Sequence, residues 1–158
     1  MLELEGDVTG SYKRLVSYNL RLRYGEATYL DADCAISNYT NADSLTLDLF
    51  VKEGQVWAQD AQQLVPSLQM PEAALRAGVV QVEGGFRGQL QDFRTNASFH
   101  SGVGDVTAKL RLRINPQTQQ LLYTGRLQTQ ALNLDSLLNR NIARRLNFKG
   151  AIRGKNLD

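Results

Sequence analysis

The stretch Glu83-Gly84-Gly85-Phe86-Arg87-Gly88 contains a pattern that organises the chain: a glycine, an apolar residue two positions later, and a second glycine two positions after that. The pattern occurs again at Gly6-Asp7-Val8-Thr9-Gly10 and at Gly150-Ala151-Ile152-Arg153-Gly154. Copies that start near residues 6, 84 and 150 predict an architecture built from serial units. A glycine inside a strand permits a bend or a close approach of another backbone. Each copy therefore indicates a sheet that curls around its apolar residue, a shallow apolar trough, or a simple bend in a barrel or sandwich.

Apolar and polar residues alternate on both sides of this stretch, with the period of a strand that has one apolar and one wet face. Examples are Leu45-Thr46-Leu47-Asp48-Leu49 before it and Val106-Thr107-Ala108-Lys109-Leu110 after it. A longer alternation joins Val16, Tyr18, Leu20, Leu22 and Tyr24. The breaks between these runs are short and turn-like, which favours antiparallel neighbours. We therefore predict an antiparallel meander of about nine or ten strands.

Three segments carry helical signals instead. Residues 60–66 begin with Asp60, which suits an N-cap, and residues 71–77 begin with Pro71 and precede Gly78. Residues 132–139 contain Asp135 ahead of two leucines. The sequence thus predicts a few short helices in a mainly β fold, and the lack of a regular strand–helix alternation disfavours a parallel α/β sheet.

Composition excludes few function classes. A chain of 158 residues with 18 basic and 16 acidic residues has a net charge of +2, which gives no electrostatic argument for nucleic acid or an anionic membrane. The single cysteine, Cys34, excludes an intrachain disulfide and a cysteine-based zinc site. No signal peptide or apolar stretch of membrane-spanning length is present in the sequence given.

No catalytic constellation is predicted. His100 is the only histidine and its neighbours do not form a nucleophile elbow. Asp31 and Asp33 share one face of a strand, where solvated carboxylates are favoured over a metal site. The glycine-rich stretch is not followed by a helix, as a phosphate loop requires. We therefore predict a chain that is not an enzyme and has no cofactor or metal.

The order of several pieces resembles a known family. The glycine pattern is followed by Gln91-Asp92-Phe93, then by Tyr123-Thr124-Gly125-Arg126-Leu127, Leu132-Asn133-Leu134-Asp135-Ser136-Leu137-Leu138 and Lys149-Gly150-Ala151-Ile152-Arg153-Gly154. This order resembles the TamB and AsmA-like envelope proteins, most closely the large TamB-like translocation and assembly module proteins of Gram-negative bacteria. The resemblance covers nearly the whole chain.

The resemblance implies a fold, a place and a role. Proteins of this family have an N-terminal inner-membrane anchor, cross the periplasm as long repetitive β-structures, and are implicated in outer-membrane protein assembly and phospholipid transport. It implies that residues 1–158 are a single β-rich domain, an internal segment of a longer repetitive protein, without the anchor and the C-terminal domain. The expected fold is an antiparallel meander curled into an open, elongated trough, like a β-taco, with a few short helices. No catalytic residue is carried over.

Two interpretations remain open. In the first, phospholipid acyl chains lie along a trough that is lined by every second residue of each strand. An outer-membrane barrel assembly protein is a further expected partner, and nucleic acid is not expected to bind. Contact with the membrane is expected only through flanking regions. The predicted lining is Val8, Leu20, Leu22, Leu30, Leu47, Leu49, Val82, Phe86, Phe99, Leu110, Leu112, Leu127 and Phe148. In the second, a closed β-barrel or sandwich binds a small apolar ligand or a partner protein, and the same parity forms a sealed core.

Overall fold

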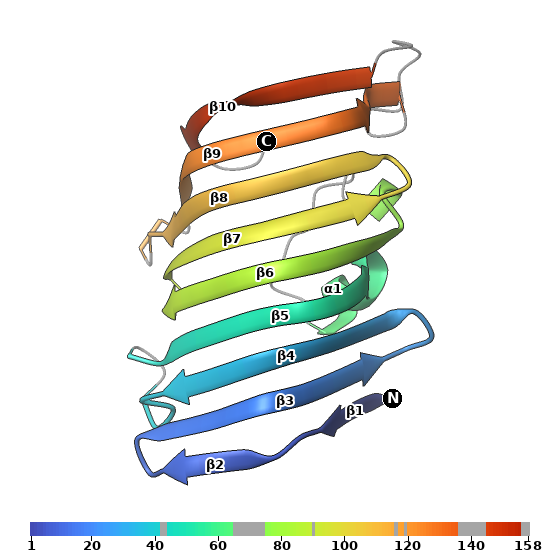
Figure 1. The fold of residues 1–158 in the computed structure, drawn as a ribbon. Helices are drawn as coiled ribbons and strands as arrows, with labels where there is room; N and C mark the ends of the chain where they lie inside the picture. The colour runs from blue at the N-terminus through green and yellow to red at the C-terminus, as the bar shows by residue number, and fades with distance from the viewer. Residues whose placement is uncertain are drawn as a thin grey trace.

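The computed structural model describes residues 1–41, 44–64, 75–89, 91–115, 117–118, 120–135 and 145–155. Within these ranges ten strands form one antiparallel sheet, and one helix flanks it (Figure 1). The strands are β1 (Leu2–Glu5), β2 (Val8–Ser11), β3 (Arg14–Tyr24), β4 (Thr28–Ser37), β5 (Thr46–Trp57), β6 (Val79–Gln89), β7 (Asp92–Ser101), β8 (Gly104–Ile114), β9 (Leu121–Asn133) and β10 (Arg145–Lys155). The helix is α1 (Ala58–Leu64).

The sheet is a simple meander. Strand order follows the chain from β1 through β3 to β10, and β2 also pairs with β3, so β1 and β2 share one edge. At about 4.8 Å between strands, the eight spacings from this edge to β10 span about 38 Å. The two edges do not pair with each other, so the sheet is open and is not closed into a barrel. The predicted fold class, an open, curved antiparallel meander, is confirmed, and the closed alternative is wrong as a description of this fold (Figure 1).

The helical predictions were only partly correct. Helix α1 begins at Ala58, two residues earlier than predicted, and Asp60 lies in its first turn. Only the end of the predicted segment 71–77 is described, where Leu75 and Arg76 are helical. In segment 132–139, Leu132 and Asn133 are the last residues of β9, because they pair with Leu146 and Arg145 of β10. Residues 134–135 are helical and the rest of that segment lies outside the described residues.

The register divides the sheet into two faces. Residues that are partners across antiparallel strands point to the same side. One row of partners joins Leu49, Phe86, Thr95, Leu110 and Gly125, and we call its side the apolar face. The neighbouring row, shifted by one residue, is Asp48, Arg87, Arg94, Arg111 and Thr124, and we call its side the polar face.

Burial is confined to the apolar face. All ten strand residues that are buried in the described structure lie on it: Ser17, Thr28, Ala32, Val51, Gly54, Val82, Thr95, Ala97, Ala108 and Thr129. The centre of this core is Ala32, Val51 and Val82, against which Leu30, Phe86 and Phe99 pack. Helix α1 covers Thr28 at one end of this face. Elsewhere in a sheet of one layer, curvature and long neighbouring side chains bury such residues, so we take the apolar face as the inner side of the curve.

Register shifts in β3, β5 and β9 change the face that side chains take. In β3 the register with β4 shifts between Ser17 and Leu20, so Leu15 and Ser17 lie on the apolar face and Val16 lies on the polar face. Tyr18 lies in the bulge and is 67% exposed. Lys52, itself in a bulge of β5, donates a hydrogen bond from Nζ to the Tyr18 carbonyl at 2.7 Å. The predicted continuous alternation from Val16 to Tyr24 was therefore wrong.

The three glycine patterns lie in different local structures. Gly84 and Gly88 both lie in β6 with φ of 135° and 141°, a region that residues with a Cβ rarely adopt. A Cβ on Gly84 would lie 2.3 Å from the Asn96 carbonyl oxygen, so β6 approaches β7 in a way that only glycine allows. In the first copy only Gly10 has such a φ, and in the third copy neither glycine does. The sequence repeat is thus not a repeat of one backbone geometry.

Candidate functional site

All thirteen residues predicted to line a trough lie on the apolar face. The register places Leu47 and Leu49 of β5 beside Gly88 and Phe86 of β6, and the same row continues to Leu110 of β8. The set extends over nearly every strand: Val8 in β2, Leu20 and Leu22 in β3, Leu30 in β4, Leu47 and Leu49 in β5, Val82 and Phe86 in β6, Phe99 in β7, Leu110 and Leu112 in β8, Leu127 in β9 and Phe148 in β10. The structure therefore brings these residues onto one continuous surface.

This surface is only partly covered by the protein itself. Of the thirteen residues only Val82 is buried, and the members between the edges are otherwise half-buried. Exposure is highest at the two edges, with Val8 at 58% and Phe148 at 37%. Leu4 on β1 is 63% exposed on the same face. A sealed core would hide these side chains, so the described part of the apolar face is not a sealed core.

Small residues between the leucines were missing from the predicted lining. Ser17, Thr95, Ala97, Ala108 and Thr129 are buried on the apolar face and form its floor. Their position in the alternating runs is the signal that could have identified them, because they share the parity of their apolar neighbours. Their small size lets the longer leucine and phenylalanine side chains stand above them as walls.

Helix α1 is held against the apolar face at one end of the strands. The Thr28 hydroxyl of β4 donates to the Asp60 carboxylate at 2.6 Å and accepts from the Trp57 backbone N–H at 3.0 Å. Asp60 is 4% exposed, so this pair is shielded from water. A strong hydrogen bond to a buried carboxylate therefore fixes where the chain leaves β5.

The lone thiol belongs to the same face. Cys34 of β4 is half-buried and is the register partner of Leu49. Burial raises the pKa of the Cys34 thiol, and the charge of Asp48 raises it further. Cys34 therefore contributes a neutral, apolar group to the surface rather than a reactive thiolate.

Ion pairs across strands cover the polar face. Asp31 lies 3.7 Å from Arg21, and Asp33 lies 2.6 Å from Lys52. The His100 imidazole is exposed and lies 3.1 Å from Asp105, its register partner. As predicted, these aspartates and this histidine lie on the outer, wet side of the sheet.

A further ion pair on this face, Asp92 with Arg111, makes stability depend on pH. Hydrogen bonds from Arg111 at 2.6 and 2.8 Å, with the nearby charges of Arg113 and Arg94, lower the pKa of Asp92 although partial burial opposes them. A lowered folded-state pKa stabilises the fold above the unfolded pKa of about 4, and this stabilisation disappears as pH falls through the folded pKa. We expect Asp92→Asn to unfold at lower urea than the wild type at pH 7, with a difference that shrinks toward zero near pH 2.

Urea titrations at both pH values check this expectation. The effect at pH 7 is small, about 1 kcal/mol or less, because the pair is exposed to solvent. A difference that stays the same at both pH values would show that Asp92 acts through something other than its charge.

Two kinds of feature are absent from the described ranges. They contain no group of three or more His, Cys, Asp or Glu side chains arranged to hold a metal ion. Nor does any described helix have the length and hydropathy needed to cross a membrane. Comparison with known protein families, curated proteins and solved structures gives no match. The resemblance to TamB-like proteins therefore stays a prediction from the sequence.

Proposed function

We propose that this chain is a non-enzymatic segment of a TamB-like envelope protein that spans the periplasm from an inner-membrane anchor. Its apolar face holds phospholipid acyl chains during transport between the membranes. As a second role, the same segment acts with a barrel assembly protein in the assembly of outer-membrane proteins. The proposal combines the resemblance in sequence with the geometry of the apolar face.

The observation that carries the proposal is the continuous, half-exposed apolar face of an open sheet. This face extends across all nine strand positions of the sheet, from β1 to β10. Its apolar side chains, such as Leu22, Leu49, Leu110 and Leu127, are only half-buried. Each CH₂ group that leaves water for this surface contributes about 0.8 kcal/mol when fully covered. Two adjacent acyl chains on the apolar face would shield the lining residues and each other from water.

The chemistry of the face suits an acyl chain better than a polar ligand. Its walls are leucine and phenylalanine, and the hydroxyl of Thr129 on its floor already binds the Phe148 N–H at 3.0 Å. Hydrophobic contact is not directional, so a chain without hydrogen-bonding groups can slide along such a surface. The ion pairs of the polar face keep the opposite side of the sheet in water.

A charge placed on the apolar face tests this proposal. Leu110 lies between Thr95 and Gly125 in its row, so an arginine there has room to extend toward solvent. We expect Leu110→Arg to stay folded and to lose at least tenfold in affinity for a phospholipid with a fluorescent acyl chain. The matched control is Gln81→Arg, which adds the same charge to an exposed position on the polar face of β6.

Two measurements decide the outcome. Fluorescence titration gives the affinity, and urea unfolding reports the fold of each variant. Equal lipid affinity in both variants and the wild type would contradict the proposal. Complete unfolding of Leu110→Arg alone would show that this position is part of a core and not of a binding surface.

A further inference from the structure

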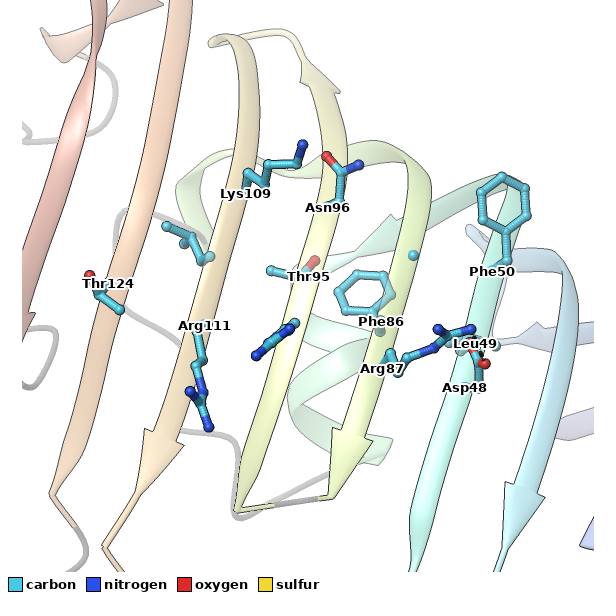
Figure 2. Close-up of a pocket in the computed structure, with 13 residues that line it drawn as sticks. Asp48, Leu49, Phe50, Phe86, Arg87, Thr95, Asn96, Lys109, Arg111 and Thr124 are labelled. Atoms are coloured by element: carbon cyan, nitrogen blue, oxygen red, sulfur yellow. Dashed lines mark hydrogen bonds and ion pairs between the residues drawn. The ribbon is translucent and has the colours of Figure 1, made fainter.

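A second surface, on the opposite side of the sheet, contains a hollow of about 610 Å³ over β5 to β9 (Figure 2). It is lined by side chains from two adjacent rows of the polar face, one through Arg87, Arg94 and Arg111 and the other through Gly85 and Lys109. The residues between these rows, such as Phe86 and Leu110, direct their side chains to the apolar face, so only their backbone can form the floor. Gly85 contributes space to the hollow because it has no side chain.

Its charges are arranged unusually. Arg87, Arg94 and Arg111 are direct cross-strand partners, and like charges in that position destabilise a sheet. The two outer arginines are compensated, since Arg87 pairs with Asp48 (Figure 2) and Arg111 forms two hydrogen bonds with Asp92. Among the described residues, neither the Arg94 guanidinium nor the Lys109 ammonium forms an ion pair or a side-chain hydrogen bond. Lys109 thus has no counter-ion in the described structure, and Arg94 is compensated only at longer range by the charge of Asp92, which Arg111 already binds.

The ligand that suits this arrangement is an oxyanion. Arg94 offers several N–H donors in a plane and Lys109 offers a compact positive charge, and both groups commonly bind phosphate. The amide of Asn96 and the hydroxyl of Thr124 also border the hollow and can complete its set of donors. The expected anion is tetrahedral, with oxygens on several sides.

The hollow is larger than inorganic phosphate requires. Its volume lies within the range of about 300–1,000 Å³ that is typical of small-molecule sites. At its rim the ring of Phe50 is 50% exposed and lies next to Gly85, 3.9 Å from the place of an added Cβ. An exposed aromatic ring beside cations offers a flat apolar surface for the organic part of a ligand.

We propose that this hollow binds an organic phosphate, with the phosphate on Arg94 and Lys109 and the organic body against Phe50. The site lies on the opposite side of the sheet from the apolar face, so this proposal can be tested separately from the proposed lipid role. The same phosphate chemistry occurs in a small soluble ester and in a lipid head group, and the two sources require separate tests.

Gly85→Thr is the most direct variant. A Cβ at Gly85 would make only ordinary contacts, at 3.9 Å from Leu49 and Phe50, and the φ of Gly85 is not positive. The strand therefore accepts the change, and the threonine side chain occupies part of the hollow. Lys109→Gln removes one central cation. Lys155→Gln removes the same charge from β10, outside the hollow, and is the matched control.

Isothermal titration calorimetry with phenyl phosphate tests the soluble source, and sedimentation with phosphatidylglycerol vesicles, against phosphatidylcholine vesicles, tests the lipid source. We expect the wild type and Lys155→Gln to bind at least one of the two phosphates, and Gly85→Thr and Lys109→Gln to lose at least tenfold in that affinity. Binding of phenyl phosphate assigns the site to a soluble ester, and binding of phosphatidylglycerol alone assigns it to a head group. No binding of either by the wild type, or equal binding by Gly85→Thr and Lys109→Gln, overturns the proposal.

Discussion

Gly84→Ala is expected to destabilise the sheet by about 3 kcal/mol or more, whereas Gly85→Ala leaves stability unchanged or raises it by about 0.5 kcal/mol. At Gly84 the new Cβ would lie 2.3 Å from the Asn96 carbonyl oxygen and 2.5 Å from the Cα of Ala97, in a backbone with φ of 135°. Backbone must move, because no flexible side chain can yield. At Gly85 the atoms nearest to the new Cβ are 3.9 Å away. Alanine also lowers the conformational entropy of the unfolded chain, which stabilises the folded state.

Urea unfolding followed by circular dichroism measures both variants under one set of conditions. The two positions are adjacent on one strand and differ in their contacts and φ, so each serves as the control for the other. Equal stability of the two variants would mean that β6 does not approach β7 through Gly84 as the structure shows. The result also tests the curvature of the sheet, because β6 is the middle strand in the strand order.

Val51→Asp is expected to abolish cooperative folding. Val51 is 2% exposed and lies between Ala32 and Gly84 at the centre of the core. An unpaired carboxylate there loses its water and gains no partner, which costs more than about 4 kcal/mol. In a single-layer sheet that is close to the whole stability of a domain of this size.

Phe50→Asp is the matched control for this substitution. Phe50 is the preceding residue on the same strand, but it lies on the polar face and is 50% exposed. We expect its replacement to change the free energy of unfolding by about 1 kcal/mol or less. Thermal melts followed by circular dichroism check both variants. A cooperative melt of Val51→Asp with the midpoint of the wild type would show that this face has no core.

The faces of the sheet were largely predictable because they depend on local alternation. Leucines at every second position, as in Leu45 to Leu49, place their side chains on one side of any strand, whatever its partners. This local rule is why all the predicted lining residues fall on one face. It fails at a β-bulge, and at the bulge around Tyr18 the exposed carbonyl accepts a hydrogen bond from Lys52, a residue far along the chain.

Boundaries and openness required information that the local sequence lacks. Leu132 and Asn133 suit a helix by composition, yet pairing with β10 extends β9 through them. Alternation is the same in an open trough and a closed barrel, because the difference is whether β1 and β10 pair. The hollow on the polar face was missed for a related reason: Arg87, Arg94 and Arg111 come from three strands and meet only through the register.

Native mass spectrometry of the purified chain, after incubation with phospholipid, tests the central claim most directly. We predict adducts with the mass of intact phospholipid on the wild type, which disappear in Leu110→Arg and persist in Gln81→Arg. A wild-type chain that stays free of lipid under these conditions would contradict a lipid-holding apolar face.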